Sequence, residues 1–153
     1  MSVVAVIRPD SWNFPLFLHV LGAMILVGGL LTGVAALATA KGSERLLRLG
    51  YWSLLAVSLP GWILMRIGAQ WIATKEHWDD VPDDLIPAWL NIGFLIADIG
   101  GLVLLLSLIL GGVGVYRMRE GKGVGLLKAT LVLSFIALAA YVVAVWAMAG
   151  KPD

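Results

Sequence analysis

Three polar side chains interrupt apolar segments of the sequence, and they are the residues best placed to do chemistry. His19 lies within LFLHVLGAMILVGGLL, Arg66 within PGWILMRIGAQW and Asp98 within NIGFLIADIGGLVLLL. A charged group in the hydrocarbon core of a membrane costs about 2.5–3.5 kcal/mol on insertion scales, so such groups usually face protein or water. An imidazole in this setting can bind a metal or a haem, or handle protons.

The composition places these residues in a membrane protein. The 153-residue chain is 60% hydrophobic and 14% charged, and its mean hydropathy is +0.93. A soluble domain is nearer 45–50% apolar and about 25% charged. Four apolar segments reach the roughly 20 residues that a helix needs to cross the hydrocarbon core, and they span about 14–40, 49–73, 88–115 and 126–149. We therefore expect an all-α, transmembrane up-down four-helix bundle, with residues 1–153 forming a single integral membrane domain.

The charged connections predict the orientation of this bundle. The first and third connections are basic, with Lys41, Arg45, Arg48, Arg117, Arg119, Lys122 and Lys128. The second connection is acidic, with Glu76, Asp79, Asp80, Asp83 and Asp84. Because short loops rich in Lys and Arg stay in the cytoplasm, we expect both basic loops inside. The N-terminus, the C-terminus and the acidic loop are then expected outside.

Polar groups of all four helices fall at similar depths. A rise of 1.5 Å per residue puts His19, Arg66, Tyr141 and Asp98 about 9–15 Å inward from the expected outer helix ends. Gln70 lies one turn from Arg66, and Asn91 shares a face with Asp98. We therefore expect an outward-opening polar intramembrane site formed by His19, Arg66, Gln70, Asn91, Asp98 and Tyr141.

Each of these residues also has a structural interpretation. Arg66 and Asp98 are most simply an ion pair between helices that fixes the bundle, although Arg66 can also extend toward the lipid headgroups. His19 can form a hydrogen bond across helices, and Tyr141 can serve as a packing aromatic. Both interpretations stay open at the level of the sequence.

The residue types restrict metal chemistry. The chain has two histidines and no cysteine, and His77 lies in the acidic loop. A haem with two histidine ligands inside one chain is therefore not expected, whereas a haem that takes one ligand from each of two subunits stays open. His19 with Met24 or Met65 can hold copper, because imidazole and thioether groups suit Cu(I). Haem and copper are thus the cofactors to consider, with His19 as the metal ligand.

The sequence contains no catalytic motif: H-E-x-x-H, G-x-S-x-G and Walker A patterns are all missing. We therefore expect a protein that is not an enzyme. Gly29 and Gly33 form a G-x-x-x-G pair that favours close helix packing, and Pro60 is expected to kink the second helix or free a carbonyl near Ala56. The expected partners are the lipid bilayer and either a homodimer or a membrane complex, with no nucleic acid.

The first helix carries a family resemblance. Phe17-Leu18-His19-Val20-Leu21-Gly22-Ala23, followed by Gly28-Gly29, resembles the opening helix of small bacterial four-helix integral membrane proteins of uncharacterised families, and more distantly that of copper-resistance D-like proteins. The resemblance implies that His19 matches the histidine of the motif. It also implies a metal- or haem-linked role in a bacterial inner (plasma) membrane that the chain crosses several times.

Three functions follow as hypotheses. The first is an inner-membrane protein whose outer polar site binds a metal or haem or handles protons. The second is a structural or assembly subunit of a membrane complex, in which the polar layer serves helix packing only. The third is a small dimeric transporter.

Overall fold

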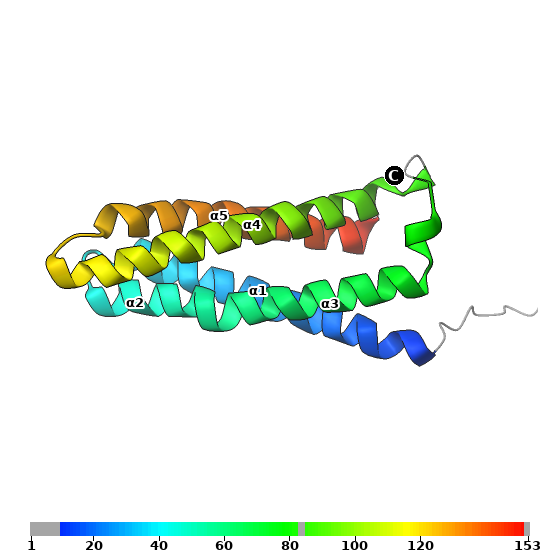
Figure 1. The fold of residues 1–153 in the computed structure, drawn as a ribbon, viewed down its shortest axis with the longest axis horizontal. Coiled ribbons are helices and arrows are strands. Elements are labelled where there is room, and N and C mark those ends of the chain that lie inside the picture. Colours follow the sequence, from blue (N-terminus) through cyan, green and yellow to red (C-terminus); the bar gives the residue numbers. More distant parts are fainter. Residues whose placement is uncertain (1–9, 83–84, 152–153) are drawn as a thin grey trace, which may run out of the picture.

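Four long helical segments form the computed structural model, which describes residues 10–82 and 85–151 (Figure 1). Three of them are continuous α-helices: α1 (Asn13–Thr39), α4 (Ala88–Arg117) and α5 (Val124–Gly150). The remaining segment consists of α2 (Glu44–Ser53), a π-helical turn (Leu54–Ser58) and α3 (Leu59–Lys75). Short 3-10 turns occupy Asp10–Trp12, Trp78–Asp80 and Met118–Glu120. The all-α prediction is confirmed, and all four segments are long and apolar enough to cross a membrane.

The helix ends agree closely with the predicted apolar segments except at the start of the second. That helix begins at Glu44, whereas the apolar pattern predicted a start near residue 49. Ser43 has an extended backbone, and the helix continues from there through Arg45 and Arg48 before it becomes apolar. Hydropathy detects only the part of a helix that is apolar, so it does not detect a charged first turn.

The distortion predicted at Pro60 is present as the π-helical turn that precedes it. Pro60 has no backbone N–H, so the carbonyl of Ala56, four residues earlier, has no α-helical donor at that position. The Leu59 N–H bonds to the Leu54 carbonyl, which is five residues back. The longer hydrogen-bonded loop accommodates the proline without breaking the helix.

Glycines hold α1 against α2 and α3. A methyl group on Gly61 would lie 2.5 Å from the Leu26 backbone nitrogen, and one on Gly68 would lie 2.5 Å from the His19 backbone nitrogen. Gly29 and Gly33 pack in the same interface, on Ser58 and Leu54 respectively. Ser53 adds a hydrogen bond from its hydroxyl to the Gly29 carbonyl (2.9 Å). The predicted close packing through the G-x-x-x-G pair thus occurs within the chain.

The bundle therefore consists of two helical hairpins, one formed by α1 with α2–α3 and the other by α4 with α5. Aromatic side chains of the first hairpin cover glycines of α4: Tyr51 lies over Gly111, and Trp62 lies over Gly101. In Figure 1 the hairpins lie close together near the turns that join α1 to α2 and α4 to α5, and they diverge toward the connection between α3 and α4.

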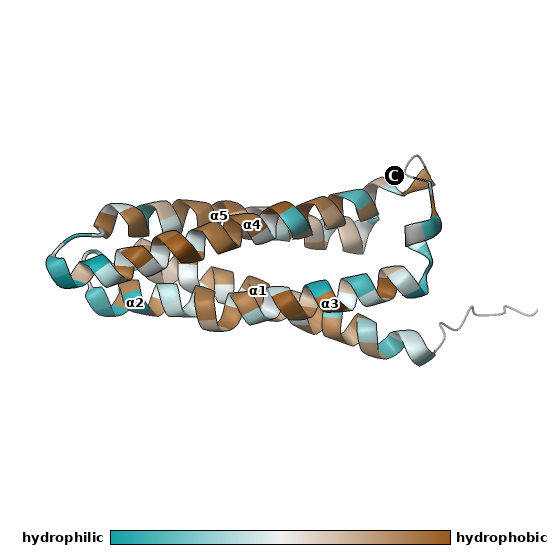
Figure 2. Ribbon diagram, viewed as in Figure 1, coloured by the Kyte–Doolittle hydropathy of each residue, from teal (hydrophilic) through white to brown (hydrophobic). Residues whose placement is uncertain are grey.

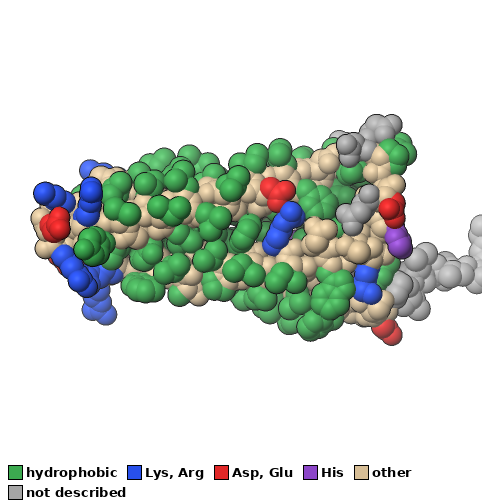
Figure 3. All heavy atoms as spheres, in the orientation of Figure 1, with side chains coloured by type: hydrophobic (Ala, Val, Ile, Leu, Met, Phe, Trp, Pro, Cys, Tyr) green, Lys and Arg blue, Asp and Glu red, His purple; other side chains and the backbone are tan. Residues whose placement is uncertain are grey.

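The two ends of the bundle differ in charge. We call the end formed by the α1–α2 and α4–α5 turns the basic end, since it carries Lys41, Arg45, Arg48, Arg117, Arg119, Lys122 and Lys128. We call the end at the 76–87 connection the acidic end; Asp83 and Asp84 of the predicted acidic loop lie outside the described residues. Figure 2 shows hydrophobic helices between these ends, and Figure 3 shows the same band in atomic detail.

Two glycines of α1 provide a matched test of the packing. Gly22→Ala should lower the unfolding temperature in detergent, because the added methyl collides with the backbone of Met65 and overpacking typically costs about 1–3 kcal/mol. Gly28→Ala should leave it unchanged or raise it slightly, because nothing lies within 4 Å of the added methyl. Equal effects of the two substitutions would contradict the observed contact between α1 and α3.

Candidate functional site

The diverging hairpins leave a cavity of about 810 Å³ between them. Its wall is formed chiefly by apolar residues of α1, α3, α4 and α5, among them Ala23, Ala69, Phe94 and Ala144. At the acidic end the lining residues are Trp12, Glu76, Trp78, Trp89 and Lys151. The volume falls within the range of about 300–1,000 Å³ that is typical of small-molecule sites. The cavity is thus apolar in depth, with aromatic and charged groups at its mouth.

His19 is the one histidine in the described part of this wall. Its Nδ1 lies 3.1 Å from the Met65 carbonyl oxygen. Because a carbonyl only accepts, Nδ1 must carry the proton that it donates, and the neutral ring then has its lone pair on Nε2. Gly68 permits this arrangement by letting the backbone of His19 lie directly against α3. The predicted hydrogen bond across helices is therefore confirmed.

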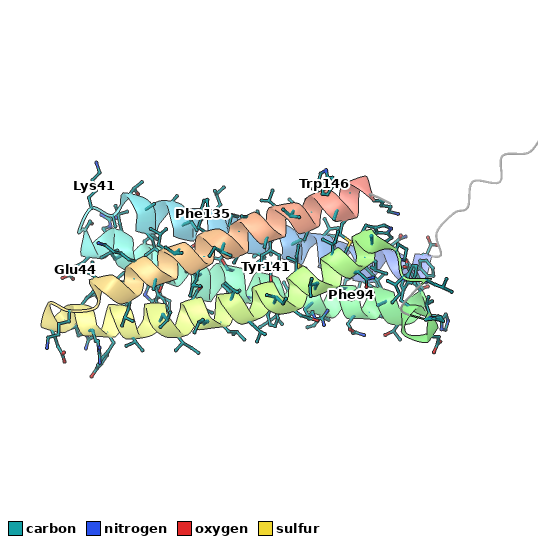
Figure 4. All side chains as sticks on the ribbon, turned by 90° about the horizontal axis from the view of Figure 1, so that it is seen from above. Lys41, Glu44, Phe94, Phe135, Tyr141 and Trp146 are labelled. Atoms are coloured by element: carbon teal, nitrogen blue, oxygen red, sulfur yellow. The ribbon has the colours of Figure 1, made fainter. Side chains whose placement is uncertain are left out.

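Tyr141 also lines the cavity, from α5. It is 2% exposed, its ring lies over Gly100 of α4, and Figure 4 shows it near the middle of the bundle. Trp62 is a neighbour of its hydroxyl, but the indole N–H of Trp62 is donated to the Ala97 carbonyl at 3.0 Å. The Tyr141 hydroxyl is thus buried with no hydrogen-bond partner among the described residues.

Arg66 and Asp98 form the ion pair that the sequence predicted. The Arg66 Nη2 lies 2.7 Å from the Asp98 Oδ1, which links α3 to α4. Phe94 lies beside the guanidinium group, with its ring centre 5.8 Å from the Arg66 Cζ. The Asp98 side chain is 57% exposed and that of Arg66 30% exposed. Figure 3 shows acidic and basic side chains next to each other within the hydrophobic band on this face of the bundle.

A second, smaller cavity of about 330 Å³ lies between α3 and α4. Its wall contains Gln70 and Asp98, together with Val81 and Ile86 of the connection between the two helices. Phe94 lines both this cavity and the larger one. Trp78 and Leu90 also line both cavities, so the two cavities share part of their walls.

The six predicted site residues do not all line one cavity. His19 and Tyr141 line the large cavity, whereas Arg66, Gln70 and Asp98 lie on the outward side of α3 and α4. Asn91 is exposed on α4 and lines neither cavity. Equal depth in the bundle did not reveal which way each side chain points.

Two aromatic residues of the site were not predicted from the sequence. Trp62 joins α3 to α4 through its hydrogen bond to the Ala97 carbonyl, and Phe94 lines both cavities. The spacing contained a signal for the first, because Trp62 lies one turn before Arg66 and faces the same helix. Nothing in the sequence distinguishes Phe94 from the other apolar residues of its segment.

The described residues contain no group of three His, Asp or Glu side chains placed to hold a metal ion. At the acidic end the Nδ1 of His77 lies 3.5 Å from the Asp80 Oδ2, and both side chains are about 80% exposed to solvent. Any metal bound in the cavity would therefore have to combine His19 with thioether groups or with a cofactor.

Comparison with known proteins finds no relative of this chain. No family model, curated protein or solved structure matches the chain.

The unpartnered hydroxyl of Tyr141 leads to a prediction about stability. Tyr141→Phe should leave the unfolding temperature unchanged or raise it, because a buried polar group without a hydrogen bond costs about 1–3 kcal/mol. Trp62→Phe should lower it, because it removes the bond to the Ala97 carbonyl. Thermal unfolding of both variants in the same detergent checks this. A loss in Tyr141→Phe as large as that in Trp62→Phe would show that the hydroxyl is satisfied in the folded protein.

Proposed function

We propose that this chain is a multi-pass membrane protein, not an enzyme, that binds an apolar or amphipathic small molecule in the large cavity and orients it through His19. The observation that carries the proposal is the position of a single imidazole in the wall of an otherwise apolar cavity of about 810 Å³. Such a cavity with few, well-placed polar groups is the usual form of a ligand site.

The hydrogen bond of His19 supports a role in binding. Its Nδ1 is occupied by the Met65 carbonyl, so Nε2 is the nitrogen that can accept a hydrogen bond or bind a metal. Histidines that bind metals usually donate their other N–H to a carbonyl or a carboxylate, which fixes the ring. His19 is held in this way by a backbone group that cannot move without α3.

The cavity favours a large ligand over a bare ion. A bare copper ion needs several donors that converge, and His19 is the only imidazole in the described wall. A haem-sized planar molecule would need apolar walls and a nitrogen ligand, and the cavity wall with His19 would supply both. If a haem is the ligand, His19 would hold its iron, and the haem would supply the electron-transfer or gas-binding chemistry. Proton transfer is less well supported, because no hydrogen bond joins His19 to Tyr141 in the described residues.

The surrounding membrane is part of the proposal. Four helices can cross a bilayer, and we place the chain in a bacterial inner membrane as an up-down bundle. The positive-inside rule assigns the basic end to the cytoplasm, which puts both termini, the acidic end and the mouth of the cavity outside. Trp12, Trp78 and Trp89 at the mouth are then at the depth where such rings prefer the headgroup region.

A structural or assembly subunit is the second candidate function. The observation in its favour is the Arg66–Asp98 pair, in which the two charged side chains satisfy each other without a ligand. The two functions differ in what the purified protein retains.

Blocking the cavity distinguishes the ligand-binding function from the structural function. The protein purified from membranes should retain a small molecule, detected by native mass spectrometry and, for a haem, by its absorption spectrum. Ala144→Phe should abolish this retention, because Ala144 lines the cavity. His19→Ala should reduce it several-fold and change the spectrum of a metal-containing ligand.

A matched control is available on the same helix. Ala139→Phe makes the same change at an exposed position outside the cavity wall and should retain the ligand as the wild type does. Haemin added to all four proteins supplies a direct binding measurement. If the folded wild type retains nothing and binds haemin no better than Ala144→Phe, the ligand-binding function is wrong and the structural function stands.

The absence of cysteine allows the orientation to be tested with single labels. In intact cells a membrane-impermeant maleimide should modify Asp80→Cys, at the acidic end, and should not modify Ser43→Cys, at the basic end. Both positions are exposed at the ends of helices, so both should react once the membrane is permeabilised. The reverse pattern in intact cells would invert the proposed topology.

A further inference from the structure

The Arg66–Asp98 pair lies where a charged pair is least expected. Arg66 is nine residues before the end of α3 and Asp98 ten residues after the start of α4, so both lie about 14–15 Å below the acidic end. More than half of the Asp98 side chain is exposed there. Its neighbours on the outer surface are apolar, including Ile63, Ile67 and Leu95, all of them exposed.

Within a bilayer, exposing this charged surface to lipid tails would cost free energy, because the tails cannot solvate the charges. Charged residues in membrane helices almost always face protein or water, whereas the Asp98 carboxylate is exposed on this surface with Arg66 as its ion-pair partner. Gln70 and Asn91 are exposed on the same two helices. The outward side of α3 and α4 thus contains one positive group, one negative group and two amide groups, and apolar side chains surround them.

We propose that this surface, defined by Arg66, Gln70, Asn91, Leu95 and Asp98, is the interface of a homodimer. A two-fold axis that passes near the ion pair would bring Arg66 of each copy toward Asp98 of the other, because a two-fold interface joins identical patches. Each charge would then have two opposite charges beside it instead of one. Gln70 and Asn91 supply amide groups that hydrogen-bond across membrane helices.

The charge pattern favours a second copy over other occupants. A surface with one positive and one negative group is complementary to itself, whereas a lipid phosphate satisfies only the arginine and leaves Asp98 exposed. The small-residue surface that commonly joins membrane helices is also occupied, since Gly29 and Gly33 of α1 pack inside the chain. The dimer is independent of the proposed ligand, since neither Arg66 nor Asp98 lines the large cavity that contains His19.

A charge-reversal experiment tests the interface. Arg66→Asp leaves only carboxylates at the centre of the surface, and Asp98→Arg leaves only guanidinium groups. When the two variants are co-expressed with different tags, the mixed dimer should exceed either homodimer by at least about tenfold, because like charges repel and opposite charges attract. Wild-type chains with the same two tags should give a statistical mixture.

Crosslinking tests the same surface without changing its charges. In the cysteine-free chain, Leu95→Cys should be joined to a second copy by a short bismaleimide in native membranes. Phe135→Cys should not be joined, because Phe135 lies on α5, away from this surface (Figure 4). The two native side chains are equally exposed, at 59%, so the comparison is matched for access.

Three results would overturn the proposal. The first is a statistical mixture of the reversed variants together with no Leu95→Cys crosslink. The second is a monomer that retains an anionic lipid in native mass spectrometry, and the third is a Leu95→Cys crosslink to a different protein. Retention of the cavity ligand is measured separately in the same samples, so a failure of the dimer and a failure of the ligand-binding function are distinguishable.

Discussion

The close approach of α1 to α3 through glycine is the contact on which the rest of the structure depends. In a membrane, lipid tails are as apolar as leucine, so helices associate through close packing and hydrogen bonds. Gly61 and Gly68 bring the backbones of the two helices together over several turns. This contact also places His19, because its backbone lies against Gly68 and its ring then reaches the Met65 carbonyl. The geometry of the histidine is a consequence of helix packing.

The cavity results from an uneven distribution of contacts between the two hairpins. Toward the basic end, Tyr51 and Trp62 cover glycines of α4, and leucines of all four helical segments fill the space behind them. Beyond Trp62, toward the acidic end, α3 and α4 are joined by the Arg66–Asp98 pair and then separate. Apolar residues continue along both hairpins past this point, but they are too far apart to fill the gap. The cavity extends deeper than this pair, since Leu26, which packs on Gly61, also lines it.

Much of the fold could be predicted from the sequence because hydropathy and helix length are local properties. The four segments, the distortion before Pro60 and the ion pair between Arg66 and Asp98 followed from residue types and spacing, and the structure confirms each of them. The direction of each side chain could not be predicted in this way. It depends on which helices are neighbours, and depth along a helix contains no information about that. His19 and Arg66 lie at similar depth and belong to different surfaces for this reason.

The division of the polar residues changes what each can contribute. A single layer of six polar groups would have been wet, and its charges would have competed with any apolar ligand. Because Arg66 and Asp98 pair with each other and do not line the large cavity, His19 is the polar side chain at depth in its wall, and the Tyr141 hydroxyl is itself buried. Phe94 contributes to this separation, since its ring lies beside the guanidinium group and also lines the cavity, and Trp78 and Leu90 line both cavities with it. Shared apolar and aromatic side chains thus allow a charged outer surface and an apolar interior to occur at the same depth of a small bundle.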